Sequence, residues 1–298
     1  MSETLDQSAF ADELRPAVER LYDRHLEVAR PWSAYDVIDW SQAEGFGDKP
    51  WSPSDYPLNE AARSSVVVNL LTEDNAPYYT HLIKSVTPKD HPLQTWNNQW
   101  TMEEGQHSYA IRTWAHLSRA VDPDELEAGR RTQMAGGVVP QPETLADMLA
   151  YVPFQEKATQ IAHSNTGSHL PREDKTGRKV LALVAGDETK HYNFYRDVAG
   201  SAIEVDPSAM VIAISSQVRG FAMPGTGIPG FKEHADKIAK AGIYNLSHFK
   251  EKVVEPTLEA WDIKNVEGLN DEAEVARDKL FAFVEKVGRV ATRLGHTS

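Results

Sequence analysis

Two short segments carry the same pattern of potential metal-binding residues, an acid followed by Glu-x-x-His. The first segment contains Glu104 and His107, and the second contains Glu188 and His191. Residues three positions apart lie on the same face of a helix, so each pair offers a carboxylate and an imidazole to one metal ion. Composition alone would yield about one such pair by chance, so the pattern needs support from its surroundings.

The helices expected around these pairs provide that support. Two further glutamates, Glu73 and Glu156, lie in apolar stretches of the first and third of four long helical segments, and the Glu-x-x-His pairs lie on the second and fourth. This arrangement is that of a carboxylate-bridged two-metal centre in a four-helix bundle. Four buried carboxylates require cations, and oxygen ligands with imidazole suit iron or manganese. The alternative is that these acids lie on solvated helix faces.

Composition narrows the chemistry further. The chain of 298 residues has no cysteine, which excludes disulfides, thiolate zinc sites, cysteine-ligated iron–sulfur clusters and cysteine nucleophiles. The formal net charge of −13 disfavours binding to nucleic acid or to anionic membranes. The longest uncharged stretch, residues 158–171, is too short to cross a bilayer, and no signal peptide is visible. We therefore expect a cytoplasmic protein without a membrane span.

Hydrophobic periodicity predicts the helices that position these groups. A helix over residues 10–28, with Pro16 in its first turn, precedes an irregular Pro- and Trp-rich segment over residues 31–58. Pro77 should interrupt the first long helix, and Pro142 suits the first turn of the third. The four long helices are expected over residues 59–84, 93–117, 142–165 and 177–198, and further helices over residues 207–221, 231–241, 247–261 and 271–294.

No alternating strand pattern, hairpin signal or internal repeat occurs in the sequence. The predicted fold class is therefore all-α, a helical bundle with additional helices in a single domain over residues 1–298. Within it we expect an N-terminal helix and strap over residues 1–58, a metal-binding core over residues 59–200 and additional helices over residues 201–298.

Several stretches resemble the soluble acyl-carrier-protein desaturases, most closely their actinobacterial members. The resemblance covers nearly the whole chain and includes the tail over residues 223–244. The matching motifs, in chain order, are Leu71–Asp74, Trp100–His107, Phe154–Thr159 with Ala162–Asn165, and Asp187–His191.

The resemblance implies a ferritin-like four-helix bundle that carries two Fe ions, cycling between Fe2+ and Fe3+, with additional N- and C-terminal helices. Glu104 and Glu188 would bridge both irons. The implied iron ligands are Glu73, Glu104, His107, Glu156, Glu188 and His191.

The resemblance also implies roles for residues beside the ligands. Thr159 would lie near the oxygen-binding position and aid proton delivery; alternatively, its hydroxyl bonds back to its own helix. Asp187 would orient the His107 ring, and Trp51 would extend this relay toward the surface unless it is simply packed. We expect His163 to be a satisfied core group rather than a ligand.

The implied activity is O2-dependent desaturation, which places a cis double bond in a saturated acyl chain held on an acyl carrier protein. Electrons would come from a ferredoxin-type donor and its reductase, and the protein would form a homodimer. A helix face with Leu145, Met148, Leu149 and Val152 could line the acyl channel, although ordinary core packing is the commoner use of such residues. The densest basic run, residues 172–179, is interrupted by acids, so no docking residues are predicted.

Three alternatives remain at this point. A di-iron hydroxylase or oxidase of an acyl or other apolar substrate would use the same ligands, and a ferritin-like storage protein would take up many irons. A catalytically inactive homologue is the third, because Gly105 and Gln106 stand where plant relatives have Asn and Arg.

Overall fold

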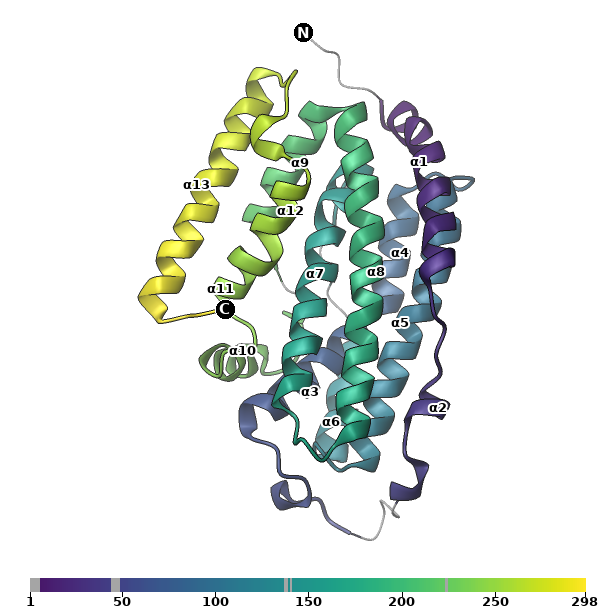
Figure 1. The fold of residues 1–298 in the computed structure, drawn as a ribbon, viewed down its shortest axis with the longest axis vertical. Coiled ribbons are helices and arrows are strands. Elements are labelled where there is room, and N and C mark those ends of the chain that lie inside the picture. Colours follow the sequence, from purple (N-terminus) through teal and green to yellow (C-terminus); the bar gives the residue numbers. More distant parts are fainter. Residues whose placement is uncertain (1–5, 44–48, 137–138, 140, 223–224) are drawn as a thin grey trace.

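The computed structural model describes residues 6–43, 49–136, 139, 141–222 and 225–298, and this part of the chain is helical without a β-strand. Long helices run side by side along the molecule (Figure 1). The predicted all-α bundle is confirmed. Its four central helices are α3 (Glu60–Glu73), α5 (Pro92–Leu117), α7 (Leu145–His169) and α8 (Lys175–Val205).

The other helices surround this bundle. In Figure 1, α1 and α2 lie along one side and α12 and α13 along the other. Within the described residues, no helix is long and apolar enough to cross a membrane. The surrounding elements are α1 (Gln7–Val28), α2 (Ala34–Val37), η1 (Trp40–Gln42), η2 (Pro53–Asp55), α4 (Ala76–Val86), α6 (Pro123–Gly136), α9 (Pro207–Arg219), α10 (Phe231–Lys240), α11 (Leu246–His248), the π-helical η3 (Phe249–Val254), α12 (Glu255–Ala260), η4 (Ile263–Asn265) and α13 (Asp271–Leu294).

Short polar residues start three of the central helices. The Asn59 side chain accepts the Ala62 N–H at the start of α3, and Thr144 accepts the Asp147 N–H at the start of α7. At the start of α8, Asp174 accepts an N–H in the same way. Each cap satisfies a backbone donor that has no partner inside the helix, so these residues set where the helices begin.

A proline separates the first long helical segment into two helices, as predicted. Pro77 is the second residue of α4 and has no N–H to donate to the carbonyl of Glu73, four residues earlier. The chain therefore breaks between α3 and α4, and Glu73 becomes the last residue of α3.

Some predicted boundaries were wrong. Pro16 lies inside α1 because Asp6 caps that helix and starts it at Gln7. Pro142 precedes α7, whose start is set by its Thr144 cap. The helix α8 does not close near residue 198 but continues to Val205, and α6 was not predicted. Residues 223 and 224 of the tail lie outside the described residues.

Two hydrophobic clusters pack the bundle, one toward each end. Along α5, Trp100 belongs to the first cluster and Ala110 to the second, and along α8 these positions are held by Phe194 and Val184. Both Glu-x-x-His pairs therefore lie in a polar layer between the clusters. The helix α7 is buried around nearly its whole circumference, which is typical of the central helix of a bundle.

Candidate metal centre

The six predicted ligands converge at one buried place. They come from α3, α5, α7 and α8, and each side chain is nearly inaccessible to solvent. Their candidate ligand atoms form two groups, and the atoms in each group all lie within 4.8 Å of one another. The groups are Glu73, Glu104, His107 and Glu188, and Glu104, Glu156, Glu188 and His191.

Glu104 and Glu188 belong to both groups, whereas each group has one further glutamate and one histidine of its own. The two shared carboxylates therefore lie between two adjacent positions, each of which offers three carboxylates and one imidazole. This is the arrangement that a carboxylate-bridged pair of metal ions requires.

Both imidazole rings turn the same nitrogen toward the carboxylates. The Nδ1 atom of His107 lies 3.2 Å from Glu104 and 3.5 Å from Glu73. The Nδ1 atom of His191 lies 3.0 Å from Glu104 and 3.7 Å from Glu156. The Nε2 atoms face outward, so Nδ1 is the candidate ligand atom on each ring.

Without a cation these groups perturb one another strongly. Burial raises the pKa of Glu156 well above its ordinary value, and the Glu188 carboxylate adds to the shift. Burial alone would lower the pKa of His107, but Glu104 and Asp187 outweigh it and raise that pKa well above its ordinary value. Bound cations would take the place of the protons that these groups hold.

Unpartnered polar atoms also indicate a cation. Among the described residues, several buried atoms of the second group have no hydrogen-bond partner, and each such atom costs about 1–3 kcal/mol unless something else satisfies it. The buried Glu and His groups thus fit a metal site. The atoms without a hydrogen-bond partner are Glu104 Oε1, Glu156 Oε2, Glu188 Oε2 and His191 Nδ1.

Asp187 lies where the sequence predicted, beside the His107 ring. Its Oδ2 atom lies 3.3 Å from Nε2 of His107, and Lys190 pairs with its Oδ1 atom. Burial opposes ionisation of Asp187, but the hydrogen bond with His107 and the other partners lower its pKa to about 2. Asp187 is therefore an ionised acceptor for the outer nitrogen of His107.

The predicted relay role of Trp51 was wrong. Trp32 donates its indole N–H to Oδ2 of Asp187 at 2.7 Å, and its ring stacks near His107 with the ring centroids 6.4 Å apart. Trp51 instead donates to the backbone carbonyl of Arg119 at 2.9 Å, in the turn after α5. Both tryptophans lie in the same Pro- and Trp-rich segment. Which of them reaches Asp187 depends on the path that this segment takes over the bundle.

Three further side chains contact the ligands. Trp100 donates its indole N–H to Glu156 at 3.0 Å, and His163 lies 2.7 Å from Glu73. His163 is buried and lies outside both ligand groups, as expected. Glu103, the residue before Glu104, lies 2.7 Å from the outer nitrogen of His191. From the sequence, Glu103 could be either a solvated acid or a neighbour of the ligands, and this contact makes it a neighbour.

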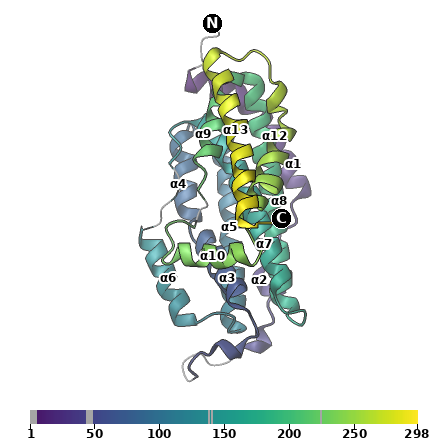
Figure 2. The ribbon, with the colours of Figure 1, turned by 90° about the vertical axis from the view of Figure 1, so that its left-hand side faces the viewer.

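A small cavity lies beside the centre. Its volume is about 90 Å³, and its lining includes Thr72 on α3, Thr159 on α7 and Phe231 on α10. Figure 2 shows α10 lying across the long helices at this level. The Thr159 hydroxyl bonds back to the carbonyls of Gln155 and Glu156, and Thr159 is one of the residues that line this cavity.

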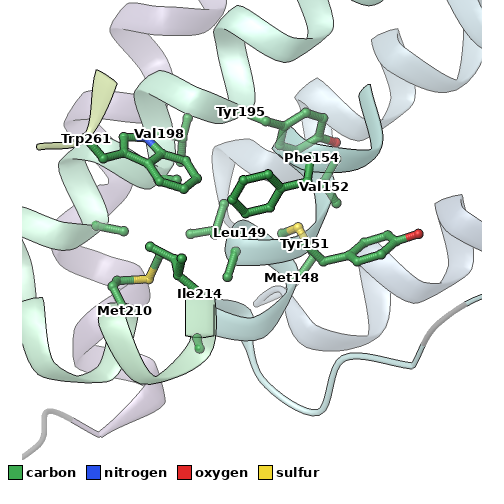
Figure 3. Close-up of a cluster of buried hydrophobic side chains, with 14 of the residues drawn as sticks. Met148, Leu149, Tyr151, Val152, Phe154, Tyr195, Val198, Met210, Ile214 and Trp261 are labelled. Carbon is green, nitrogen blue, oxygen red and sulfur yellow. The ribbon is translucent and has the colours of Figure 1, made fainter. Parts of the chain in front are cut away.

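The expected acyl-channel face is not a channel here. Leu145, Met148, Leu149 and Val152 are fully packed in a hydrophobic cluster. In Figure 3, Met148, Leu149 and Val152 lie in one cluster with Val198, Met210 and Ile214. These residues belong to the first hydrophobic cluster, whereas Ile238 of α10 belongs to the second, so ordinary core packing accounts for this face of α7.

Comparisons with known proteins agree with this architecture. The sequence model of the family described as "Fatty acid desaturase" matches residues 6–298. DesA1 of Mycobacterium tuberculosis, a proposed acyl-[acyl-carrier-protein] desaturase, is 35% identical over 291 residues, covering 94% of this chain and 86% of that protein. The chloroplastic stearoyl-[acyl-carrier-protein] 9-desaturase of Solanum commersonii is 26% identical over 294 residues, covering 90% and 73%.

A solved structure shares the fold. The X-ray structure of DesA2 of Mycobacterium tuberculosis, also a proposed acyl-ACP desaturase, matches with a TM-score of 0.73 at 22% identity, covering 87% of this chain and 97% of that one. The buried carboxylate and imidazole groups of the four-helix bundle define a helical protein with a site that fits metal. The match over nearly the whole length shows more: the chain belongs to the fatty acid desaturase family.

Proposed function

We propose that this protein is an O2-dependent acyl-[acyl-carrier-protein] desaturase that introduces a cis double bond into a saturated acyl chain. The observation that carries the proposal is the convergence of six buried side chains into two groups that share Glu104 and Glu188. Relatives named as acyl-[acyl-carrier-protein] desaturases support the substrate class.

Two iron ions are the cofactor we assign to this centre. Glu73 and His107 would complete one position, and Glu156 and His191 the other, with Glu104 and Glu188 held in common. Bound there, the irons would supply the reduction of O2 and the removal of two hydrogens from adjacent methylene carbons. Carboxylate and imidazole donors favour iron or manganese over soft metals, which supports this assignment.

The chain's own residues would orient the ligands and exclude water. Asp187 would hold the His107 ring with Nδ1 directed inward, because it accepts from Nε2. Trp32, half-buried and bonded to Asp187, would connect this ligand to an electron donor at the surface. Thr159 would hold a proton at its hydroxyl beside the cavity.

The cavity next to Thr159 is our candidate for the reacting part of the acyl chain. An apolar cavity of about 150 Å³ holds a molecule the size of benzene, so about 90 Å³ is too small for a whole acyl chain. Substrate entry would therefore require outward movement of α10, which contributes Phe231, Ala235 and Ile238 to the lining.

The proposal includes the partners and location expected from the sequence. These are an acyl carrier protein, a ferredoxin-type donor with its reductase, a homodimer, and a cytoplasmic setting. The mycobacterial and chloroplastic relatives named above support the carrier protein as a partner.

Product analysis tests the proposal. The protein is loaded with Fe2+ without oxygen, reduced, and exposed to O2 with acyl carrier proteins of several chain lengths. Mass spectrometry should show an acyl product lighter by two hydrogens. An alcohol that carries labelled oxygen would instead support a hydroxylase, and two bound irons with no product from any acyl carrier would contradict desaturation.

A further inference from the structure

The two metal positions have matching supports on their outer sides. In α8, Asp187 precedes Glu188 and contacts the outer nitrogen of His107 on α5. In α5, Glu103 precedes Glu104 and contacts the outer nitrogen of the histidine on α8 at 2.7 Å. Each acid thus reaches across the bundle to the histidine of the opposite helix.

The contact with Glu103 engages the outer nitrogen of His191. A carboxylate can only accept, so the Nε2 atom of His191 must carry the hydrogen. With a metal ion on Nδ1, the atom that lies 3.0 Å from Glu104 and faces the ligand group, Nε2 would be the ring nitrogen that keeps its hydrogen. A metal-binding imidazole generally needs such an outer acceptor to hold its ring in place.

Glu103 is itself held in one orientation. Its Oε1 atom accepts from Gln99 at 2.7 Å and lies 3.1 Å from Nε2 of His25 on α1. His25 is 4% exposed, and its ring packs edge-on against Trp96 with the centroids 4.7 Å apart. The carboxylate therefore bridges the N-terminal helix and the candidate ligand on α8.

We propose that Glu103 is a positioning residue for His191, and that His25 extends this support from α1 to the second metal position. The inference rests on the proposed dinuclear centre. It adds that Glu103 and His25 support the second metal position and not the first. Asp187 supports the first position through His107, and Glu103 supports the second through His191.

This assignment is tested by measuring metal binding in variants in which only one of the two metal positions is left intact. Glu73→Gln should weaken the first position and leave the second, and Glu156→Gln should do the reverse. Into each background we introduce Glu103→Gln, or Asp187→Asn as the matched variant. The metal-free proteins are titrated with Co2+, and binding is followed by equilibrium dialysis and by the visible absorption of the bound ion.

Glu103→Gln should lower Co2+ affinity about 10–100-fold in the Glu73→Gln background and have little effect in the Glu156→Gln background. Asp187→Asn should show the opposite dependence. His25→Gln should act like Glu103→Gln but more weakly, whereas Asp23→Asn, on the exposed side of α1, should change nothing.

Equal effects of Glu103→Gln in both backgrounds, or no effect in either, would overturn the inference. Circular dichroism of each metal-free variant checks the fold, and His25→Gln provides the test if Glu103→Gln does not fold. The readout is independent of acyl chemistry. If the wild-type protein does not bind Co2+ at all, the result counts against the proposed centre. If the wild type binds Co2+ and Glu103→Gln leaves the Co2+ affinity unchanged, the result counts against this inference alone.

Discussion

At the scale of single residues, the glutamates of the centre are not equivalent. Glu104 and Glu188 belong to both ligand groups, whereas Glu73 and Glu156 belong to one each. This distinction was implied by a family resemblance, and the structure supplies a geometric basis for it. It also makes the four glutamates experimentally separable.

Removing a shared carboxylate should therefore lower the number of bound irons per chain more than removing an unshared one. We expect two irons per chain for the wild type, one for Glu73→Gln or Glu156→Gln, and fewer than one for Glu104→Gln or Glu188→Gln after dialysis. Inductively coupled plasma mass spectrometry gives the ratio. Equal losses for all four variants would contradict the shared arrangement.

Trp32 provides a second prediction at this scale. Since Trp32 contacts Asp187 and stacks near His107, Trp32→Phe should slow reduction of the iron-loaded protein by about 10-fold or more without changing its metal content. Stopped-flow measurement with a reduced ferredoxin tests this. Trp51→Phe is the control: it loses a hydrogen bond to Arg119, worth about 1 kcal/mol of stability, but should reduce at the wild-type rate.

The sequence could identify the ligands but not all of their neighbours. The ligand motifs are local, since residues three apart on a helix must share a face. Trp32, His25 and His163 reach the site through contacts across 78 or more residues of sequence, and no local pattern encodes such contacts. Glu103 is the exception, because its position before Glu104 repeats that of Asp187.

At the scale of elements, helix positions followed from periodicity, whereas their ends depended on caps. All four bundle helices were predicted, and the break at Pro77 was placed correctly. The ends near Pro16 and Pro142 were not, because Asp6 and Thr144 extend or delay the helices by side-chain bonds that periodicity does not reveal.

Two glycines in these helices should respond oppositely to alanine. Gly105 is exposed inside α5, and a Cβ added there would meet open space, so Gly105→Ala should raise the free energy of unfolding by about 0.5–1 kcal/mol. A Cβ at Gly177 would collide with Trp114 and Asp174, so Gly177→Ala should lower it by about 1–3 kcal/mol. Denaturant titration measures both, and similar shifts would contradict the packing described here.

An ion pair joins the Pro- and Trp-rich segment before α3 to the turn after α5. Asp55 lies 2.7 Å from Nε of Arg119, which has a backbone φ of 55°, and this hydrogen bond lowers the pKa of Asp55. A lowered folded-state pKa contributes stability above the unfolded value of about 4, and the contribution is lost as pH falls through the folded value.

The ion pair predicts a pH-dependent difference between two proteins. The Tm of the wild type should exceed that of Asp55→Asn near neutral pH, and the difference should shrink as pH falls below the unfolded-state value of about 4. Scanning calorimetry across this range measures it. A difference in Tm that does not change with pH would show that Asp55 acts by packing rather than by its charge.

At the scale of the whole molecule, two apolar clusters enclose one polar layer. Packing of the two clusters aligns α3, α5, α7 and α8, so that their acids and imidazoles meet in the layer between the clusters. The cavity lies at this level under α10, and the apolar face of α7 expected to line the channel serves the core instead. Periodicity shows that a face is buried but not which neighbour buries it.

The most direct test of this account is the position of bound iron. Anomalous diffraction at the iron edge, from crystals of the iron-loaded protein, locates the ions without reference to any activity. We predict two peaks inside the polar layer, both in contact with Glu104 and Glu188, with His107 beside one and His191 beside the other. A single peak, or iron bound elsewhere on the chain, would contradict the central claim.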